Sequence, residues 1–141
     1  MKVSATPTAL ELIEDLKKTH GKDLLFHQSG GCCDGSAPMC YPAKEYLVGD
    51  QDVLVGEIGG IPFYISKTQH EAWKNTDLII DCIKGMGGMF SLDNGTGRKH
   101  STHSFNTINY KISIFPSFVL SFANIKRYTA YLSNKNILIT N

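Results

Sequence analysis

Acidic residues, glycine and long apolar runs are each missing from part or all of this sequence. No aspartate or glutamate follows Asp93 and no glycine follows Gly97, although the chain has 141 residues. No apolar run reaches the roughly 18–20 residues of a membrane-spanning helix, and the longest candidate, residues 112–123, contains a proline. The first residues carry no hydrophobic run, so we expect no secretory signal. These absences argue against a membrane protein and favour a cytoplasmic one.

The formal net charge of +1 is too small to indicate nucleic acid or a membrane surface as a partner. The charge is distributed unevenly along the chain. Residues 1–93 carry 8 Lys/Arg and 13 Asp/Glu, whereas residues 94–141 carry 6 Lys/Arg and no acidic residue. We therefore interpret residues 1–95 as the functional domain and residues 96–141 as a divergent, acid-free tail. Two origins of this tail stay open, a genuine basic extension and translation from a shifted or read-through frame.

Hydrophobic periodicity predicts one leading helix and several short strands. Apolar residues recur at i, i+3, i+4 and i+7 from Ala9 to Leu16, which gives residues 6–20 one apolar helical face. Short apolar stretches and glycine turns predict strands at 24–28, 45–48, 53–58, 61–65, 78–83 and 89–92, a loop at 29–42 and a short helix at 66–74. This order predicts an α+β fold, with an N-terminal helix and a small, mostly antiparallel sheet or barrel.

Residues 29–41 concentrate the side chains that carry metal or redox chemistry. Cys32, Cys33 and Cys40 fall within nine residues, and His27 precedes Cys32 by five. Thiolate and imidazole are ligands for zinc and iron, and thiolates also hold iron–sulfur clusters. The sequence therefore predicts a metal site on these four residues. Two alternatives stay open, a reactive thiol whose pKa is lowered by glycine amides and buried structural cysteines in a tight turn.

Several of these motifs resemble the domain-of-unknown-function family 779. The resemblance rests on residues 3–9, 27–41, 56–66 and 87–92, and it covers about residues 3–95 without large gaps. It implies a small cytoplasmic protein associated with an aldehyde dehydrogenase, with no established activity. Family members end in a short Arg/Ser-rich strand. No such strand is evident in this sequence, and its absence agrees with a replaced C-terminus.

The order of elements also resembles the A-type iron–sulfur carriers, the HesB-like proteins. A helix, a strand, a Gly-Gly-Cys loop and a later hairpin follow one another, and Cys32 matches the first cluster ligand of those carriers. Their C-terminal Cys-Gly-Cys has no counterpart, because no cysteine follows Cys82. The resemblance implies a HesB-like layout in which Cys33 and Cys40 would have to substitute for the missing ligands.

These observations favour an accessory protein over an enzyme. The predicted function is a cytoplasmic accessory protein whose cysteine-rich loop binds zinc, iron, an iron–sulfur cluster or a thiol partner. The resemblance adds an aldehyde dehydrogenase as a partner, and a homodimer stays open. One alternative is a small thiol-based redox or aldehyde-handling enzyme with Cys32 or Cys33 as nucleophile. Another is a structural interaction module whose glycine loop and Gly59-Gly60 hairpin form the contact surface.

Overall fold

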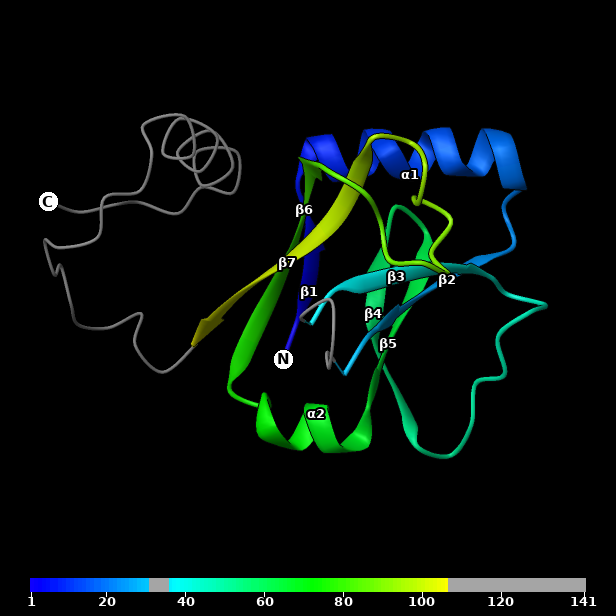
Figure 1. Cartoon of the computed structure of the whole chain (residues 1–141). Helices are drawn as coiled ribbons and strands as arrows, with labels where there is room; N and C mark the ends of the chain where they lie inside the picture. The colour runs from blue at the N-terminus through cyan, green and yellow to red at the C-terminus, as the bar shows by residue number, and fades with distance from the viewer. Residues whose placement is uncertain (31–35, 107–141) are drawn as a thin grey trace, which may run out of the picture. The chain divides into compact units, whose positions relative to one another are not determined.

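The computed structural model describes residues 1–30 and 36–106, which form two β-sheets and two helices (Figure 1). The elements in chain order are β1 (Val3–Ala5), α1 (Pro7–His20), β2 (Leu24–Gln28), β3 (Pro38–Pro42), β4 (Asp52–Ile58), β5 (Ile61–Ser66), α2 (Lys67–Ala72), β6 (Thr76–Lys84) and β7 (Arg98–Asn106). One sheet has the order β1-β6-β7 and the other the order β3-β2-β5-β4. Pairs β1/β6 and β2/β5 are parallel, and the other three described pairs are antiparallel. The α+β fold class is therefore confirmed.

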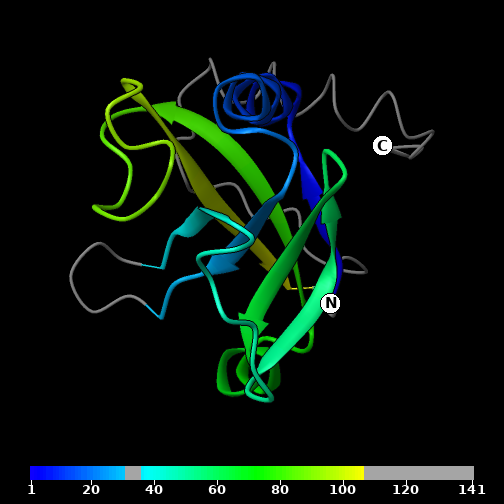
Figure 2. The ribbon, with the colours of Figure 1, turned by 90° about the vertical axis from the view of Figure 1, so that its right-hand side faces the viewer.

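Helix α1 begins and ends where its sequence signals predict. The Thr6 side chain accepts a hydrogen bond from the amide of Ala9, and Pro7 occupies the first turn, where its missing N–H costs nothing. The buried face holds the four expected apolar residues, Ala9, Leu12, Ile13 and Leu16. They join the core with residues of both sheets, among them Phe26, Phe63 and Ile80. Figures 1 and 2 show α1 at one end of the two sheets and α2 at the other.

The β4–β5 hairpin turns at Gly59 and Gly60, as expected. Both glycines have positive φ angles, +57° and +74°, a region that side chains with a Cβ rarely adopt. Pro62 follows the turn, and the pairing of β5 with β2 begins only at Phe63. The missing N–H of Pro62 therefore interrupts no bond between these two strands, although β5 lies inside the sheet.

Two predictions for residues 29–48 are wrong. Residues 38–42 were expected in a loop but form β3, an edge strand whose two prolines lie at its ends, where they cost few ladder bonds. Residues 45–48 were expected as a strand but contain no strand residue. Burial does not alternate along β3, because Pro38, Met39 and Cys40 are all buried, so no strand periodicity marks it in the sequence.

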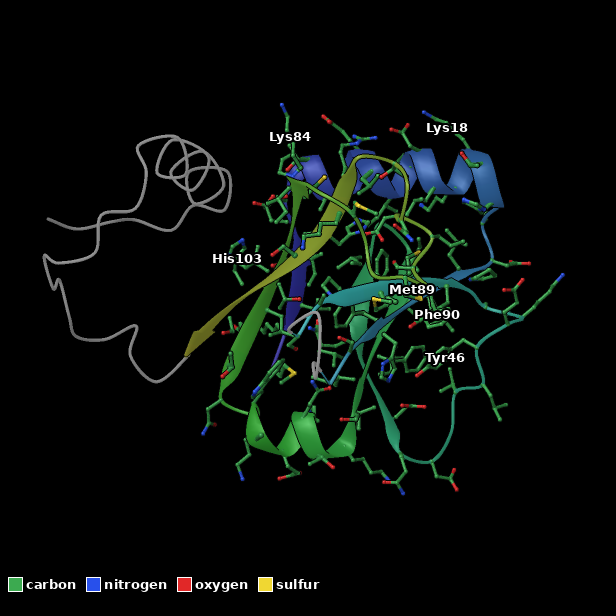
Figure 3. The ribbon with its side chains drawn as sticks, in the orientation of Figure 1. Lys18, Tyr46, Lys84, Met89, Phe90 and His103 are labelled. Atoms are coloured by element: carbon green, nitrogen blue, oxygen red, sulfur yellow. The ribbon has the colours of Figure 1, made fainter. Side chains whose placement is uncertain are left out.

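The end of the folded unit also differs from the prediction. Residues 89–92 form turns rather than the last strand, with the Met89 and Phe90 side chains 76% and 77% exposed (Figure 3). The last described strand is β7, which pairs with β6 from Arg98 opposite Lys84 onwards. A strand therefore does follow these turns, with one arginine and two serines among its nine residues. Strand β7 reaches Asn106, past the boundary expected near residue 95, and most of the expected tail, residues 107–141, lies outside the described residues.

The connection between β6 and β7 covers the free edge of β3. The amide of Cys40 donates to Ser91 Oγ at 3.0 Å, and the amide of Leu92 donates to the Cys40 carbonyl at 2.9 Å. An uncovered edge strand offers such groups to other chains. Residues 91–92 therefore hold the 85–97 connection against the sheet and place Asp93 beside β7.

Among the described residues, neither helix is long and apolar enough to cross a membrane.

Candidate functional site

The loop that carries Cys32 and Cys33 has a closed base. The amide of Ser29 donates to the Ala37 carbonyl at 2.8 Å, and the Ala37 amide donates back to Ser29 Oγ at 3.3 Å. Ser36 Oγ donates to the Ser29 carbonyl at 3.1 Å. Cys32 and Cys33 themselves lie outside the described residues. What the structure does define is where their loop starts and ends.

Side chains from three other elements hold this base in place. Gln28 is fully buried, and its amide nitrogen donates to Ser36 Oγ at 2.8 Å. Its amide oxygen accepts from Thr102 Oγ1 of β7, also at 2.8 Å. From α2, Gln69 Nε2 donates to the Ser29 carbonyl at 2.9 Å. Buried amides are costly unless they are bonded in this way, so the network fixes the loop ends relative to β7 and α2.

Cys40 is a core residue rather than an accessible thiol. It faces the same side of the sheet as its partner Phe26 and is fully buried. Burial, with a smaller contribution from the nearby Asp93 carboxylate, raises the pKa of the Cys40 thiol to about 12. A thiol that stays protonated at neutral pH is a poor nucleophile and a poor metal ligand.

His27 lies on the other face of the same sheet. It is paired with Met39, one position away from the Phe26–Cys40 pair, and side chains alternate between faces along a strand. His27 Nε2 donates to Asp52 Oδ1 at 2.9 Å, and its ring stacks on Tyr46. The structure therefore does not bring His27 and Cys40 together, and the His27 ring already has a carboxylate partner.

Asp93 and His100 form a buried pair that was not predicted from the sequence. Each is only 1% exposed, and Asp93 Oδ2 accepts from both His100 Nδ1, at 3.0 Å, and the His100 amide, at 2.9 Å. Burial raises the pKa of Asp93, but hydrogen bonds from His100 and Ser91 outweigh it and hold that pKa below its ordinary value. The carboxylate is therefore ionised at neutral pH, and Nδ1 is the ring nitrogen that donates to it.

This pair lines a small cavity next to the loop base. The cavity has a volume of about 80 Å³ and is bounded by Ala37, Pro38, Gly87, Gly88, Asp93 and His100, among others. A Cβ on Gly87 would lie 2.2 Å from Asp93 Oδ1, so only glycine allows this approach. Since one water needs roughly 10–15 Å³, the space suits a few waters or one ion and excludes a large organic ligand.

The described residues contain no group of three or more histidine, cysteine or acidic side chains that could hold a metal by themselves. They do contain one buried imidazole nitrogen without a hydrogen-bond partner among the described residues, Nε2 of His100, a residue that lines the cavity. No motif in the sequence singled out His100, and Asp93 reads as an ordinary turn residue before Asn94 and Gly95. The turns that lead from Asp93 into β7 bring the two together.

Comparisons with known proteins match this part of the chain. Residues 12–105 match the model of a family described as a domain of unknown function, DUF779. A search of curated proteins found no match. Among solved structures, the crystal structure of IscA with the 2Fe-2S cluster is similar at 18% sequence identity, covering 72% of this chain and 83% of that one, with a TM-score of 0.43. The family match includes the loop at residues 29–36 as well as Asp93 and His100.

Proposed function

This chain belongs to the family described as a domain of unknown function, DUF779, and from that premise we propose a function for its cysteine-containing loop. The protein is a small accessory protein that binds a metal ion through the thiolates of Cys32 and Cys33. It is not an enzyme in this proposal, because its chemistry is the holding of an ion. His27 and Cys40, which the sequence also suggested as ligands, are left out, since one is bonded to Asp52 and the other is buried in the core.

The observation that carries the proposal is the closed loop base. Hydrogen bonds between Ser29, Ser36 and Ala37, supported by Gln28 and Gln69, hold the two ends of the loop together. Fixed ends reduce the conformational freedom that a ligand has to remove on binding. A short loop with two adjacent thiols, two neighbouring glycines and a rigid base is therefore a favourable place for a thiophilic ion.

The donor chemistry favours a single ion over a cluster. Thiolate ligands suit zinc or ferrous iron, whereas iron–sulfur clusters are normally held by four cysteines. The other two cysteines, Cys40 and Cys82, are buried in the core of the described residues. Zinc or iron is therefore the metal of this proposal, and an iron–sulfur cluster is an outcome that the experiment has to distinguish.

Metal and acid-labile sulfide content of untagged protein, purified without oxygen, tests the proposal. The wild type is compared with the double variant Cys32→Ser/Cys33→Ser and with the control Cys82→Ser, which changes a buried thiol on β6. We expect close to one equivalent of zinc or iron in the wild type and in the control, and none in the double variant. Circular dichroism spectra establish that all three proteins are folded.

The opposite result is equally clear. A wild type that contains no metal and takes up neither added zinc nor added iron contradicts the proposal. Metal that persists in the double variant contradicts the assignment to Cys32 and Cys33. Acid-labile sulfide in a near-equal ratio to iron would replace the single ion by a cluster.

An aldehyde dehydrogenase as partner rests on the family resemblance alone. The exposed Met89 and Phe90 side chains offer a place at which to test it, because large exposed apolar groups are common at protein contacts (Figure 3). Size-exclusion chromatography of the two purified proteins should show co-elution that the double variant Met89→Ser/Phe90→Ser weakens. Separate elution at micromolar concentrations would contradict the partnership.

A further inference from the structure

Three of the four methionines of the chain lie where the β6–β7 connection passes β3. Met39 is the second residue of β3, and Met86 and Met89 lie on the connection, on either side of Gly87 and Gly88. Met39 is buried, whereas the Met86 and Met89 side chains are each 76% exposed (Met89 is labelled in Figure 3). Packing in the folded unit therefore accounts for Met39 but not for Met86 and Met89.

The Met39 thioether lies directly against the backbone of this connection. A Cβ on Gly88 would lie 2.4 Å from Met39 Sδ and 2.6 Å from Met39 Cε, so the sulfur is within about 4 Å of the Gly88 Cα. Since consecutive Cα atoms are about 3.8 Å apart, the same sulfur is within about 8 Å of the Met89 Cα. A methionine sulfur reaches about 4 Å from its own Cα, and two sulfurs on one ion can be about 4.6 Å apart at metal–sulfur distances near 2.3 Å. The reach of the Met89 side chain is therefore sufficient for both sulfurs to bind one ion.

Hydrogen bonds to the next residue of β3 keep Met39 and the connection in this register. The Cys40 amide donates to Ser91 Oγ at 3.0 Å, and the Leu92 amide donates to the Cys40 carbonyl at 2.9 Å. Cys40 follows Met39 directly, and Ser91 is two residues after Met89. Binding of an ion would therefore require side-chain rotation but no rearrangement of the backbone.

Met86 is placed to supply a third sulfur. It borders the same small cavity as Gly87 and Gly88, the two residues that follow it. Methionine is unbranched, has three rotatable side-chain bonds and carries a polarizable sulfur, so an exposed methionine adapts readily to a ligand. The exposure of Met86 also means that an ion can enter and leave without opening of the core.

The charges beside these methionines favour an ion of low charge. A Cβ on Gly87 would lie 2.2 Å from Asp93 Oδ1, so an ionised carboxylate lies next to the segment between Met86 and Met89. Lys99 borders the cavity as well and offsets that negative charge. Thioethers are neutral, soft donors, and copper(I) is the soft, monovalent ion that suits them.

We propose that Met39 and Met89, with Met86 as a third ligand, form a thioether site for copper(I). All three ligands belong to the described residues, and the site does not rest on the thiolate site of the proposed function. His27, the cross-strand partner of Met39, is not a ligand, because its ring is bonded to Asp52.

Methionine methyl NMR with silver(I) tests this proposal. Silver(I) is a redox-stable substitute for copper(I), and a ¹³C-labelled methionine methyl group reports thioether ligation by a shift of its own resonance. The protein carries Cys32→Ser/Cys33→Ser so that these thiols do not compete, and Cys40 and Cys82 are buried. We expect the methyl resonances of the three proposed ligands to shift together until the site is saturated, while that of Met1 does not move.

Conservative variants identify the ligands. Met89→Leu removes a sulfur but nearly conserves the side-chain volume, and it should weaken silver binding by about tenfold or more, a loss of at least about 1.4 kcal/mol. Met39→Leu should have the same effect if circular dichroism shows that it is folded. The matched control is Phe90→Leu, because Phe90 is the next residue, is 77% exposed and carries no sulfur (Figure 3). Competition with bicinchoninate for copper(I) measures the same differences with the proposed ion.

Two results would overturn the thioether site. One is a silver titration that shifts none of the four methyl resonances, or shifts all four at the same concentration. The other is equal silver affinity of Met89→Leu and Phe90→Leu. If the cysteine variant does not fold, the same titration is made on wild-type protein whose accessible thiols have been alkylated with iodoacetamide.

Failure of this inference differs from failure of the proposed function. The proposed function is tested by zinc and iron in protein that retains Cys32 and Cys33, whereas the thioether site is tested with those thiols removed or blocked. Silver binding by the methionines in a protein that holds neither zinc nor iron would leave only the thioether site. Zinc or iron on the cysteines with no methyl shift on silver addition would leave only the thiolate site.

Discussion

Replacing Gly87 with alanine tests how tightly the β6–β7 connection packs against β7. The new Cβ would lie 2.2 Å from Asp93 Oδ1 and 2.7 Å from the Asn94 amide nitrogen. Both atoms belong to residues whose backbone is held in turns, so a side-chain rotation alone does not relieve the contact. The φ angle of Gly87 is not in the left-handed region, and the effect is therefore one of space rather than of backbone strain.

The expected destabilisation follows from these contacts. Relief of the overlap requires Asp93 to move by roughly 1 Å, and overpacking of this kind costs about 1–3 kcal/mol. The same movement weakens the bonds from His100 to Asp93 Oδ2, and a bond to a charged group contributes about 1.5–3 kcal/mol. We expect the free energy of unfolding to fall by roughly 3 kcal/mol, which lowers the melting temperature by roughly 12–24 °C in a unit of this size.

Urea unfolding followed by tryptophan fluorescence measures this change, because Trp73 is the single tryptophan and packs against the core. The control is Gly30→Ala, since a Cβ there meets nothing within 4 Å and needs no positive φ. Gly30→Ala should not lose stability. Equal stability of Gly87→Ala and Gly30→Ala would refute the reasoning and show that residues 87–94 can shift at little cost.

Three further predictions concern single groups. Acidification should destabilise the protein through Asp93, because the pKa of this carboxyl group is lower in the folded state than in the unfolded state. Its contribution to the free energy of unfolding is complete above about pH 4, near the unfolded-state pKa, and is lost as pH falls through the folded-state pKa. Urea midpoints of wild type and Asp93→Asn between neutral and acidic pH measure this difference. Thr6→Ala should cost about 1–2 kcal/mol in thermal unfolding, because Thr6 caps α1 and also donates to Asp81 at 2.6 Å. Cys40 should react with iodoacetamide at neutral pH only after unfolding, as peptide mass spectrometry would show, because its thiol is buried with a pKa of about 12.

Each of these predictions has a contradicting result. Parallel pH profiles for wild type and Asp93→Asn would mean that Asp93 titrates alike in the folded and unfolded chain. A loss for Thr6→Ala no larger than that for Thr19→Ala, at the exposed end of the helix, would remove the capping argument. Labelling of Cys40 in the native protein would mean that the core around β3 opens readily.

Local sequence signals were enough to predict the elements whose buried residues are apolar. Short stretches of sequence determine the four-residue apolar face of α1 and the Gly59-Gly60 turn of the β4–β5 hairpin. The Ser66 cap of α2 is equally local, since its side chain accepts from the Gln69 amide. In these cases the residues that determine the structure are neighbours in the chain, and periodicity reports them directly.

Strand β7 was not predicted, because the signal that marks a strand is missing from its sequence. Its core-facing positions hold His100 and Thr102, which are polar, so no apolar alternation marks it. These side chains are accommodated because Asp93 bonds the first and Gln28 the second, across 7 and 74 residues of sequence. Polar groups that find their partners only after folding carry no periodic signal. For the same reason the Asp93–His100 pair could not be predicted.

The parallel pairing of β1 with β6 also determines when the chain can fold during synthesis. Val3 pairs with Leu78, so the first strand waits for more than seventy further residues before its partner exists. At typical synthesis rates of about 5–20 residues per second, this takes several seconds, during which the apolar face of α1 lacks its β6 contacts. The nascent chain is therefore exposed to chaperones and to misassociation until β6 leaves the ribosome. Slower translation over the first eighty codons would lengthen that interval, and a ribosome-bound chaperone that covers α1 would protect it.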